Sequence, residues 1–335
     1  MKIGVINLKA TAIAHSNTAL IKYWGKKDEQ LILPMNNSIS LTTDALTTIT
    51  TVEFSKDFEE DLFILDNKEQ AGKPKNRVIN HLNLIRELAK RNFKAKVVSE
   101  NNFPTAAGLA SSASGFAALT TATCAALDLN FDKKELSIIS RQGSGSSCRS
   151  FYGGYVEWLA GDSHESSYSI QLAKKDWFDI RDIILVLKSP ERKLSTREAM
   201  RRSIKTSPFF ATRLHSTSKN LEKMREAIQE RDFQLLGETT EKDCLSMHAV
   251  AMTSNPSQIF WAPDTLRIIH EVEQMREDDI LAYYTIDTGA NMHVLTLPEF
   301  EETVITTLKT NVPQMVDVIS SKPGKGVSLI EEHLF

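Results

Sequence analysis

The chain has 335 residues, of which 41% are apolar and 25% charged, so it has an ordinary globular composition and enough length for two domains. Its 40 basic and 43 acidic side chains give a net charge of −3, which excludes the basic excess of a nucleic-acid-binding surface. No apolar block reaches the length of a signal peptide or a membrane span, and the three cysteines share no metal-type spacing. We therefore expect a cytoplasmic protein with reduced thiols and with no nucleic-acid or membrane partner.

The first half of the chain alternates strand-like and helix-like segments. Residues 38–54 are rich in Thr, Ile and Val and partly alternate in polarity, which predicts a pair of strands. Residues 76–91 place apolar side chains on one face at helical spacing, which predicts a helix. Strands are also predicted at 61–65, 94–100 and 153–161, and helices at 110–127 and 133–143.

The second half continues an α+β pattern. We predict strands at 180–189, 280–287 and 292–297, a helix at 299–310, and a mostly helical stretch over 196–254. Pro208 and Gly237 are expected to break that stretch. The composition changes from Ser/Gly-rich to helix-rich near residue 188, so we predict domains over 1–188 and 189–335.

Residues 101–118, NNFPTAAGLASSASGFAA, join a predicted strand to a predicted helix. Small side chains at a helix start leave the first backbone N–H groups open, and these groups with the helix dipole bind anions. Ser111 and Ser112 can cap this helix and donate to phosphate oxygens. No G-K-[ST] follows, so the segment is not a Walker loop. The alternative is a closely packed helix with an alanine face.

Two further segments contain polar groups that suit an anionic ligand. Residues 141–154, RQGSGSSCRSFYGG, combine serines with Arg149 in what we expect to be a turn-rich loop, and serine hydroxyls beside a guanidinium suit an oxyanion. The alternative is a flexible linker. Residues 15–40 scatter polar groups among apolar ones: Asn17, Lys22, Tyr23, Lys26 and Ser38. For the lysines the alternative is a solvated surface turn.

The segment PTAAGLASSAS, residues 104–114, resembles the phosphate-binding motif of the GHMP kinases. Together with HSNTALIKYWGKKD, RQGSGSSCRSFYGGYVEW and TIDTGAN, it resembles one family of that superfamily, the mevalonate diphosphate decarboxylases, over most of the chain. The resemblance implies an α+β GHMP kinase fold. It would have an N-terminal ATP-binding lobe with a left-handed β-α-β crossover and a C-terminal ferredoxin-like α+β lobe.

The resemblance also implies an activity. ATP would phosphorylate the 3-hydroxyl of mevalonate 5-diphosphate, and loss of phosphate and carbon dioxide would then give isopentenyl diphosphate, a step of the mevalonate pathway of isoprenoid biosynthesis. ATP as co-substrate, Mg²⁺ and a homodimer are implied with it. The alternatives are a phosphomevalonate decarboxylase acting on the 5-phosphate, a mevalonate-type 3-kinase, and a non-catalytic sensor of a metabolite.

Matching the family motifs residue by residue assigns roles. The expected catalytic residues are Asp287, Arg149, Asn17 and Lys26. The expected substrate-binding residues are Tyr23, Lys26, Arg77, Ser144, Ser146 and Arg149. The expected ATP-binding residues are Asn101, Gly108, Ser111, Ser112, Lys193, Thr196 and Arg197. Ser112 is also the expected protein ligand of the metal.

The chain departs from the family pattern beside the expected catalytic aspartate. Where the family reads Asp-Ala-Gly-Pro-Asn, this chain has Thr288 and Ala290 in place of the alanine and the proline. Thr288 adds a hydroxyl beside Asp287, and Ala290 removes a constraint on the loop backbone. The retained Asn17, Lys26, Arg149 and Asp287 favour a full decarboxylase, but they leave open whether the substrate is a monophosphate or a diphosphate.

Overall fold

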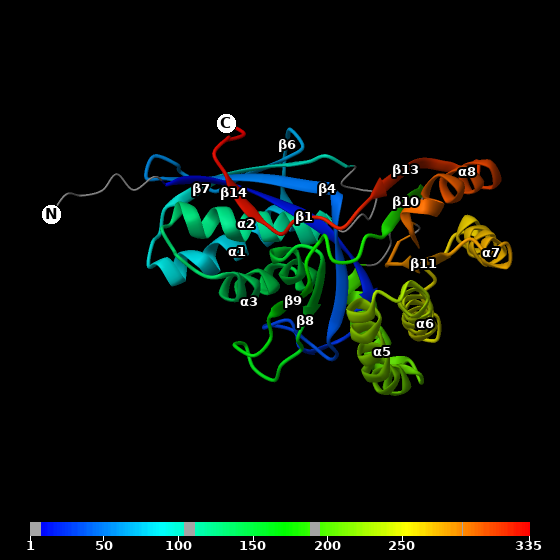
Figure 1. Ribbon diagram of the computed structural model, residues 1–335. Coiled ribbons are helices and arrows are strands. Elements are labelled where there is room, and N and C mark those ends of the chain that lie inside the picture. Colours follow the sequence, from blue (N-terminus) through cyan, green and yellow to red (C-terminus); the bar gives the residue numbers. More distant parts are fainter. Residues whose placement is uncertain (1–7, 104–110, 188–194, 290) are drawn as a thin grey trace.

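The structure is a computed structural model that describes residues 8–103, 111–187, 195–289 and 291–335. Its two larger sheets have eight and four strands. Figure 1 shows the first sheet with helices α1–α3 in one part of the molecule, and the second sheet with helices α5–α8 in the other. The mixture of helices and sheets confirms the predicted α+β class.

The first sheet is built around one long strand, β4 (Ser38–Ser55). Along its path the strand order is β14-β1-β4-β7-β5-β6, and β8 and β9 extend from the early part of β4. The pair predicted over residues 38–54 is therefore wrong, because these residues form one strand. On the edge of β4 opposite to β1, β8 pairs with its beginning and β7 with its end. The other strands are β1 (Lys9–Ile21), β5 (Leu62–Leu65), β6 (Lys68–Glu69), β7 (Lys94–Asn101), β8 (Tyr155–Trp158), β9 (Ser169–Ala173) and β14 (Ser328–Ile330).

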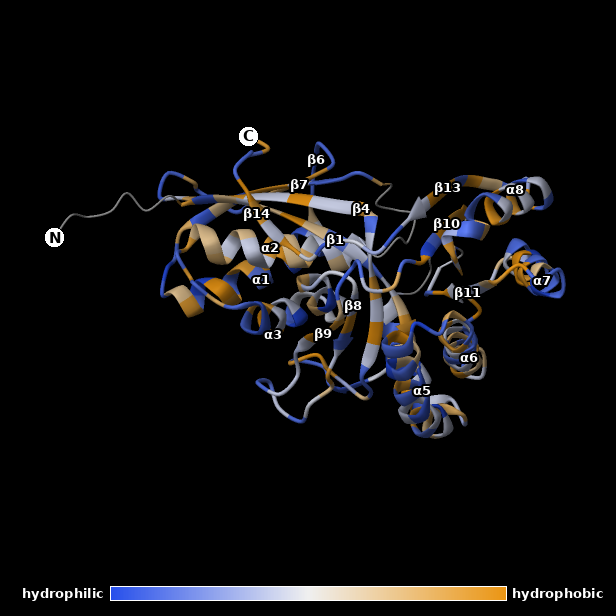
Figure 2. Ribbon diagram, viewed as in Figure 1, coloured by the Kyte–Doolittle hydropathy of each residue, from blue (hydrophilic) through white to orange (hydrophobic). Residues whose placement is uncertain are grey.

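Three helices pack on one face of this sheet: α1 (Gly72–Ala89), α2 (Ser111–Ala126) and α3 (Lys133–Gly143). They confirm the helices predicted at 76–91, 110–127 and 133–143. Helix α2 is buried on nearly all sides between β1, β4 and its neighbouring helices, and Figure 2 draws it mainly in pale and orange tones. The close-packed alternative is thus correct for the body of α2, because its small residues let the sheet approach closely.

The second sheet has the order β11-β12-β10-β13 and is antiparallel throughout. Its strands are β10 (Arg181–Leu187), β11 (Ala282–Ile286), β12 (Met292–Thr296) and β13 (Met315–Ser321). The helices of this part are α4 (Thr196–Thr206), α5 (Phe210–Glu230), α6 (Phe233–Met252), α7 (Pro263–Glu277) and α8 (Glu301–Asn311). Strand β10 precedes residue 188 but pairs with strands from the far end of the chain, and the predicted division after that residue stays a prediction.

Two local expectations differ from the structure. Gly237 does not break a helix but lies inside α6, where a Cβ would clash with the Tyr283 ring. The serine-rich segment forms a 3₁₀ helix, η2 (Gly145–Phe151), and not a loop. Helix α7 and several strands, among them β1, β9, β13 and β14, were not predicted from the sequence. Within the described ranges, no helix is both long and apolar enough to cross a membrane.

Candidate active site

An ion pair between the ends of two strands forms the centre of the candidate site. Asp287 directly follows β11 and Lys22 directly follows β1, and Lys22 Nζ donates to Asp287 Oδ1 at 2.6 Å. The Lys22 side chain is 2% exposed and that of Asp287 36%. Burial alone would raise the pKa of Asp287, but Lys22, His293 and Arg149 together lower it to about 2. Asp287 is therefore an ionised carboxylate that a ligand can reach.

A second buried polar group near Asp287 joins the two sheets. His293 on β12 bonds through Nδ1 to Asp182 Oδ1 on β10 at 3.0 Å, and Thr18 on β1 donates to Asp182 Oδ2 at 2.7 Å. Burial alone would lower the pKa of His293, but Asp182, with a further contribution from Asp287 and against Lys22, raises it. The charged imidazolium form of His293 is therefore favoured, and this form adds positive charge near Asp287.

The raised pKa of His293 makes stability depend on pH. A group whose pKa is raised by folding contributes stability that is fully present below its unfolded value, about 6.5, and that is lost as pH rises through the folded value. We expect the free energy of unfolding of wild type minus that of His293→Gln to fall as pH is raised from 6 to 9. Denaturant titrations at several pH values measure this difference. Leu266→Gln, at an exposed position without a titratable group, is the control and should show a flat difference.

Arg149 lies on η2 and is fixed by two neighbours. Its Nε and Nη2 donate to Asn17 Oδ1 at 3.2 and 3.0 Å, and its Nη1 donates to Ser38 Oγ at 2.8 Å. Asn17 in turn donates to Ser150 Oγ at 2.8 Å and to the Ser146 carbonyl at 3.2 Å. A guanidinium has five N–H donors, so these three bonds leave one donor on each terminal nitrogen. Arg149 can therefore hold a carboxylate with both terminal nitrogens.

Two arginines from distant segments meet at the end of α3. Arg77 on α1 and Arg197 on α4 donate to the Gly143 carbonyl at 3.1 and 3.0 Å. Burial, and then the Arg197 charge, lowers the pKa of Arg77 to about 10. Next to this carbonyl, Ser144 Oγ donates to Ser112 Oγ at the start of α2, at 3.2 Å. Two neighbouring cations and two hydroxyls form a site suited to a polyanion.

The residue after Asp287 connects the same region to α4. Thr288 Oγ1 lies 2.7 Å from Thr196 Oγ1, at the first residue of α4, whose N-cap is Ser195. Because Arg197 follows Thr196 in sequence, this contact links the segment after Asp287 to the pair of Arg77 and Arg197. Thr288, which departs from the family pattern, therefore contacts the start of α4 through its hydroxyl.

The remaining expected substrate residues lie in the same part of the fold. Tyr23 packs edge-on against Trp158 at a centroid distance of 4.7 Å, and its buried hydroxyl has no partner within the described residues. Burial raises the pKa of Tyr23, so this hydroxyl stays a donor. Lys26 is 3% exposed and its Nζ is 2.5 Å from Glu29 Oε2. Ser146 contacts the site through its carbonyl, which accepts from Asn17.

The expected ATP residues are less well connected. Asn101, at the end of β7, accepts from Thr48 Oγ1 at 2.6 Å, and Thr48 also contacts Ser114 on α2 at 2.7 Å. Ser111 and Ser112 are half-buried at the start of α2. Gly108 and Lys193 lie outside the described residues, as does Ala290.

Lys22 is the main residue that the sequence did not assign to the site. A lysine next to a tyrosine and a tryptophan at the end of an apolar run is compatible with a surface turn, and nothing near it in the sequence indicates its partner. The ion pair joins residues 265 positions apart. The available signal was the position of Lys22 one residue after a strand that also carries Asn17.

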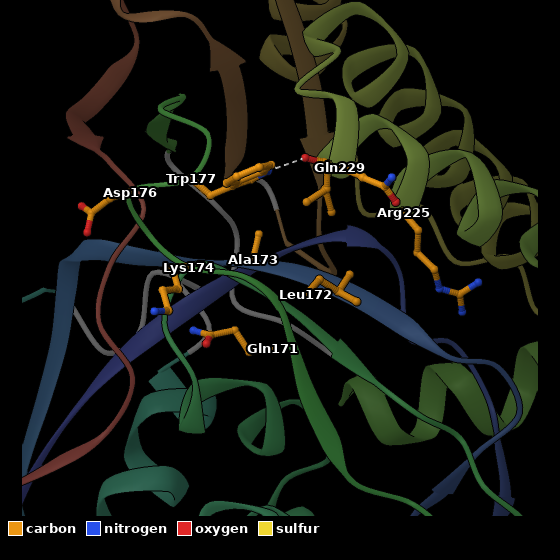
Figure 3. Close-up of a pocket in the computed structure, with 9 residues that line it drawn as sticks. Gln171, Leu172, Ala173, Lys174, Asp176, Trp177, Arg225 and Gln229 are labelled. Carbon is orange, nitrogen blue, oxygen red and sulfur yellow. Dashed lines mark hydrogen bonds between the residues drawn. The ribbon is translucent and has the colours of Figure 1, made fainter.

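A hollow elsewhere contains none of the expected site residues. It has a volume of about 730 Å³, and Figure 3 shows it between β9 and α5, lined by Leu172, Trp177 and Arg225 among others. The Trp177 indole donates to the Ile228 carbonyl at 2.9 Å.

The described part of the chain has no group of three or more His, Cys, Asp or Glu side chains that could hold a metal ion. A cation such as Mg²⁺ usually keeps several waters and is bound by one or two protein oxygens together with substrate phosphates. The Ser112 hydroxyl is compatible with that kind of binding.

The fold and this site define an α+β protein of the GHMP kinase type, with an ionised aspartate beside a set of cations. Two family models cover most of the chain: the diphosphomevalonate decarboxylase-like N-terminal domain matches residues 14–169, and the mevalonate 5-diphosphate decarboxylase C-terminal domain matches residues 182–332. The chain belongs to the diphosphomevalonate decarboxylase family, and the predicted family is confirmed.

Individual relatives agree with this assignment. The diphosphomevalonate decarboxylase of Candida albicans is 40% identical over 299 residues, which are 84% of this chain and 82% of that protein. A solved structure of MDDEF in complex with MVAPP, AMPPCP and magnesium has a TM-score of 0.92 and 40% identity, covering 97% of this chain and 99% of the other. The mevalonate diphosphate decarboxylase of Staphylococcus aureus also has a TM-score of 0.92, with 37% identity over 96% of this chain and 98% of the other. The GHMP kinase fold is thereby confirmed.

Proposed function

We propose that the chain catalyses the ATP-dependent decarboxylation of mevalonate 5-diphosphate to isopentenyl diphosphate, with ADP, phosphate and carbon dioxide as the other products. The observation that carries the proposal is the ionised Asp287, held by buried Lys22 at 2.6 Å, in a chain of this family. A sensor without chemistry would have no use for a carboxylate that is kept ionised and exposed among cations.

In the first chemical step the 3-hydroxyl oxygen attacks the γ-phosphorus of ATP, and the bond from that phosphorus to ADP breaks. Asp287 accepts the hydrogen bond of this hydroxyl and takes up its proton as the new bond forms. A carboxylate with a pKa of about 2 is a weak base, so its main contribution is alignment. Phosphoryl transfer through a loose transition state requires mainly positioning and charge neutralisation. Lys22 and Arg149 supply positive charge close to the reacting groups.

In the second step phosphate leaves C3, and the electrons of the bond between C1 and C2 form the new double bond as carbon dioxide departs. Arg149 orients the C1 carboxylate through its two remaining donors, so that this bond lies parallel to the developing empty orbital. Asn17 keeps the guanidinium in place because both of its amide atoms are already engaged.

The substrate phosphates are assigned to the arginine pair. Arg77 and Arg197 meet at the Gly143 carbonyl, next to Ser144, and the repulsion between them is relieved when a polyanion binds. We therefore assign Arg197 to the substrate, although the sequence motif implies that it binds ATP. Tyr23, Lys26 and Ser146 complete the same group, and Lys26 is released from Glu29 when a phosphate replaces that carboxylate.

For ATP we propose the start of α2, with Ser111 and Ser112, together with Gly108, Asn101, Lys193 and Thr196 as the sequence motif implies. A helix N-terminus offers free N–H groups and a favourable dipole to phosphate oxygens. Mg²⁺ supplies charge neutralisation of the phosphates when it is bound, with the Ser112 hydroxyl as its protein ligand. The MDDEF complex, which holds magnesium with AMPPCP and MVAPP, supports ATP as co-substrate and Mg²⁺ as the metal.

One experiment separates the proposed activity from its alternatives. The protein is given ATP with mevalonate, its 5-phosphate or its 5-diphosphate, and both ADP and carbon dioxide are measured. We expect equal amounts of the two products with the 5-diphosphate, and kcat/KM at least about 100-fold lower with the 5-phosphate, because Arg77 and Arg197 lose a phosphate partner. Preference for the 5-phosphate would indicate a phosphomevalonate decarboxylase. Formation of ADP without carbon dioxide would indicate a 3-kinase, and binding without either product would indicate a sensor.

The compartment and the assembly are also proposals. All three cysteines are buried and free, which suits a reducing cytoplasm. A homodimer is implied by the family motifs, and light scattering of the purified protein tests it.

A further inference from the structure

Helix α6 lies along the end strand of the second sheet and bonds to its backbone. Strand β11 has β12 on one side only, so its outward N–H and C=O groups need partners from elsewhere. Residues 241, 244 and 248, at i, i+3 and i+7 on one helix face, supply them. Glu241 Oε1 accepts from the Tyr284 N–H at 3.0 Å, and Cys244 Sγ accepts from the Ile286 N–H at 3.2 Å.

The third of these contacts completes the hold on Ile286. His248 Nε2 lies 3.2 Å from the Ile286 carbonyl, and because a carbonyl only accepts, this nitrogen carries the proton. Burial lowers the pKa of His248 to about 4 and raises that of the Cys244 thiol to about 11, so both groups are neutral at pH 7. Both backbone groups of Ile286 are thus fixed by α6, and Ile286 directly precedes Asp287.

The same helix also holds the backbone of Lys22. Lys22 is the first residue after β1, so strand pairing does not satisfy its N–H and C=O groups. The Lys22 N–H donates to Asp243 Oδ2 on α6 at 2.7 Å. The Lys22 carbonyl accepts from Arg213 Nη2 on α5 at 3.2 Å and from Asn36 Nδ2 at 3.0 Å. Arg213 in turn pairs with Asp243 at 3.1 Å, and their side chains are 1% and 0% exposed.

We propose that α6 is the positioning element of the Lys22–Asp287 pair, with Asp243 setting the Lys22 backbone and Cys244 and His248 setting the backbone before Asp287. The inference rests on the proposed role of that pair in the reaction. A buried Arg213–Asp243 pair is costly to desolvate and is weak evidence for stability. Its bonds to both backbone groups of Lys22 give it a positional role, because a displacement of about 1 Å in a reacting group can cost about 100-fold in rate.

A double-mutant cycle of Asp243→Asn and Lys22→Met tests the Lys22 side. We expect Asp243→Asn to lower kcat about 30-fold in the otherwise wild-type protein and less than about 3-fold in the Lys22→Met background, with KM for ATP unchanged. The control is Asp61→Asn, which breaks the buried Arg86–Asp61 pair between α1 and the edge of the first sheet. It should lower the melting temperature and leave kcat unchanged.

The outcomes are distinguishable. Equal costs of Asp243→Asn in both backgrounds overturn the positioning role, even when Lys22→Met keeps only the low residual kcat that the proposed function requires. Near-normal turnover of Lys22→Met overturns the role of Lys22 in the reaction, and the positioning role falls with it.

A second pair of variants tests the Asp287 side and remains informative if Asp243→Asn does not fold. Cys244→Ala removes the acceptor of the Ile286 N–H, whereas Cys244→Ser keeps a small group that can accept it. We expect kcat to fall about 5-fold in Cys244→Ala and to stay within about 2-fold of wild type in Cys244→Ser. A folded Cys244→Ala protein with the wild-type kcat contradicts the proposal.

Discussion

Asp287→Ala is expected to lower kcat by at least about 1,000-fold while ATP still binds. Among the described residues, Asp287 is the acidic group that forms an ion pair with the Lys22 ammonium. Its removal also takes away the acceptor for the 3-hydroxyl proton. ATP is assigned to the start of α2, so nucleotide binding measured by calorimetry should change little. Asp176→Asn, at an exposed carboxylate paired with Lys175, is the control and should keep wild-type kcat.

The same variant should also be less stable than Lys22→Met. Removing Asp287 leaves the ammonium of Lys22, 2% exposed, without its partner, whereas removing Lys22 leaves a carboxylate that is 36% exposed and can be hydrated. Thermal unfolding of both proteins measures the order. Turnover of Asp287→Ala within about 10-fold of wild type would refute the role proposed for this residue.

The sequence, through its resemblance to the family motifs, pointed to Asp287, Arg149 and Asn17 as candidate site residues. It missed Lys22, Asp182 and the raised pKa of His293, because these features depend on burial and on partners far away in the chain. His293, for example, bonds to a residue 111 positions earlier. The sequence shows which side chains are polar, whereas only the packed fold determines which of them are paired.

The same limit explains the errors in secondary structure. Residues 38–54 were predicted as two strands because alternation does not reveal that one strand pairs with β7 and β8 at different places along its length. Gly237 was expected to break a helix because glycine has a low helix propensity, but the Tyr283 ring occupies the space that a side chain would need. Close approach of a strand to a helix overrides propensity there.

Arg149→Gln is expected to lower kcat/KM for mevalonate 5-diphosphate by about 100- to 1,000-fold and to leave KM for ATP nearly unchanged. Glutamine keeps a polar group near Asn17 and Ser38 but has neither the charge nor the two terminal donors of the guanidinium. Arg149→Lys keeps the positive charge but not the two terminal N–H donors of the guanidinium. Its kcat/KM should lie between those of Arg149→Gln and wild type, because one ammonium cannot fix the plane of a carboxylate.

Loss of a buried arginine could lower activity through stability alone, so a matched variant is needed. Arg86→Gln removes a guanidinium that is as buried as that of Arg149, at 5% against 3% exposure, and that pairs with Asp61. We expect Arg86→Gln to lower the melting temperature while kcat/KM at 25 °C stays within about 3-fold of wild type. If both glutamine variants lose the same factor in kcat/KM, Arg149 does not hold the carboxylate. If only Arg149→Gln loses kcat/KM, Arg149 is assigned to the C1 carboxylate that leaves as carbon dioxide, because this variant keeps Asp287 and the phosphate site at the start of α2.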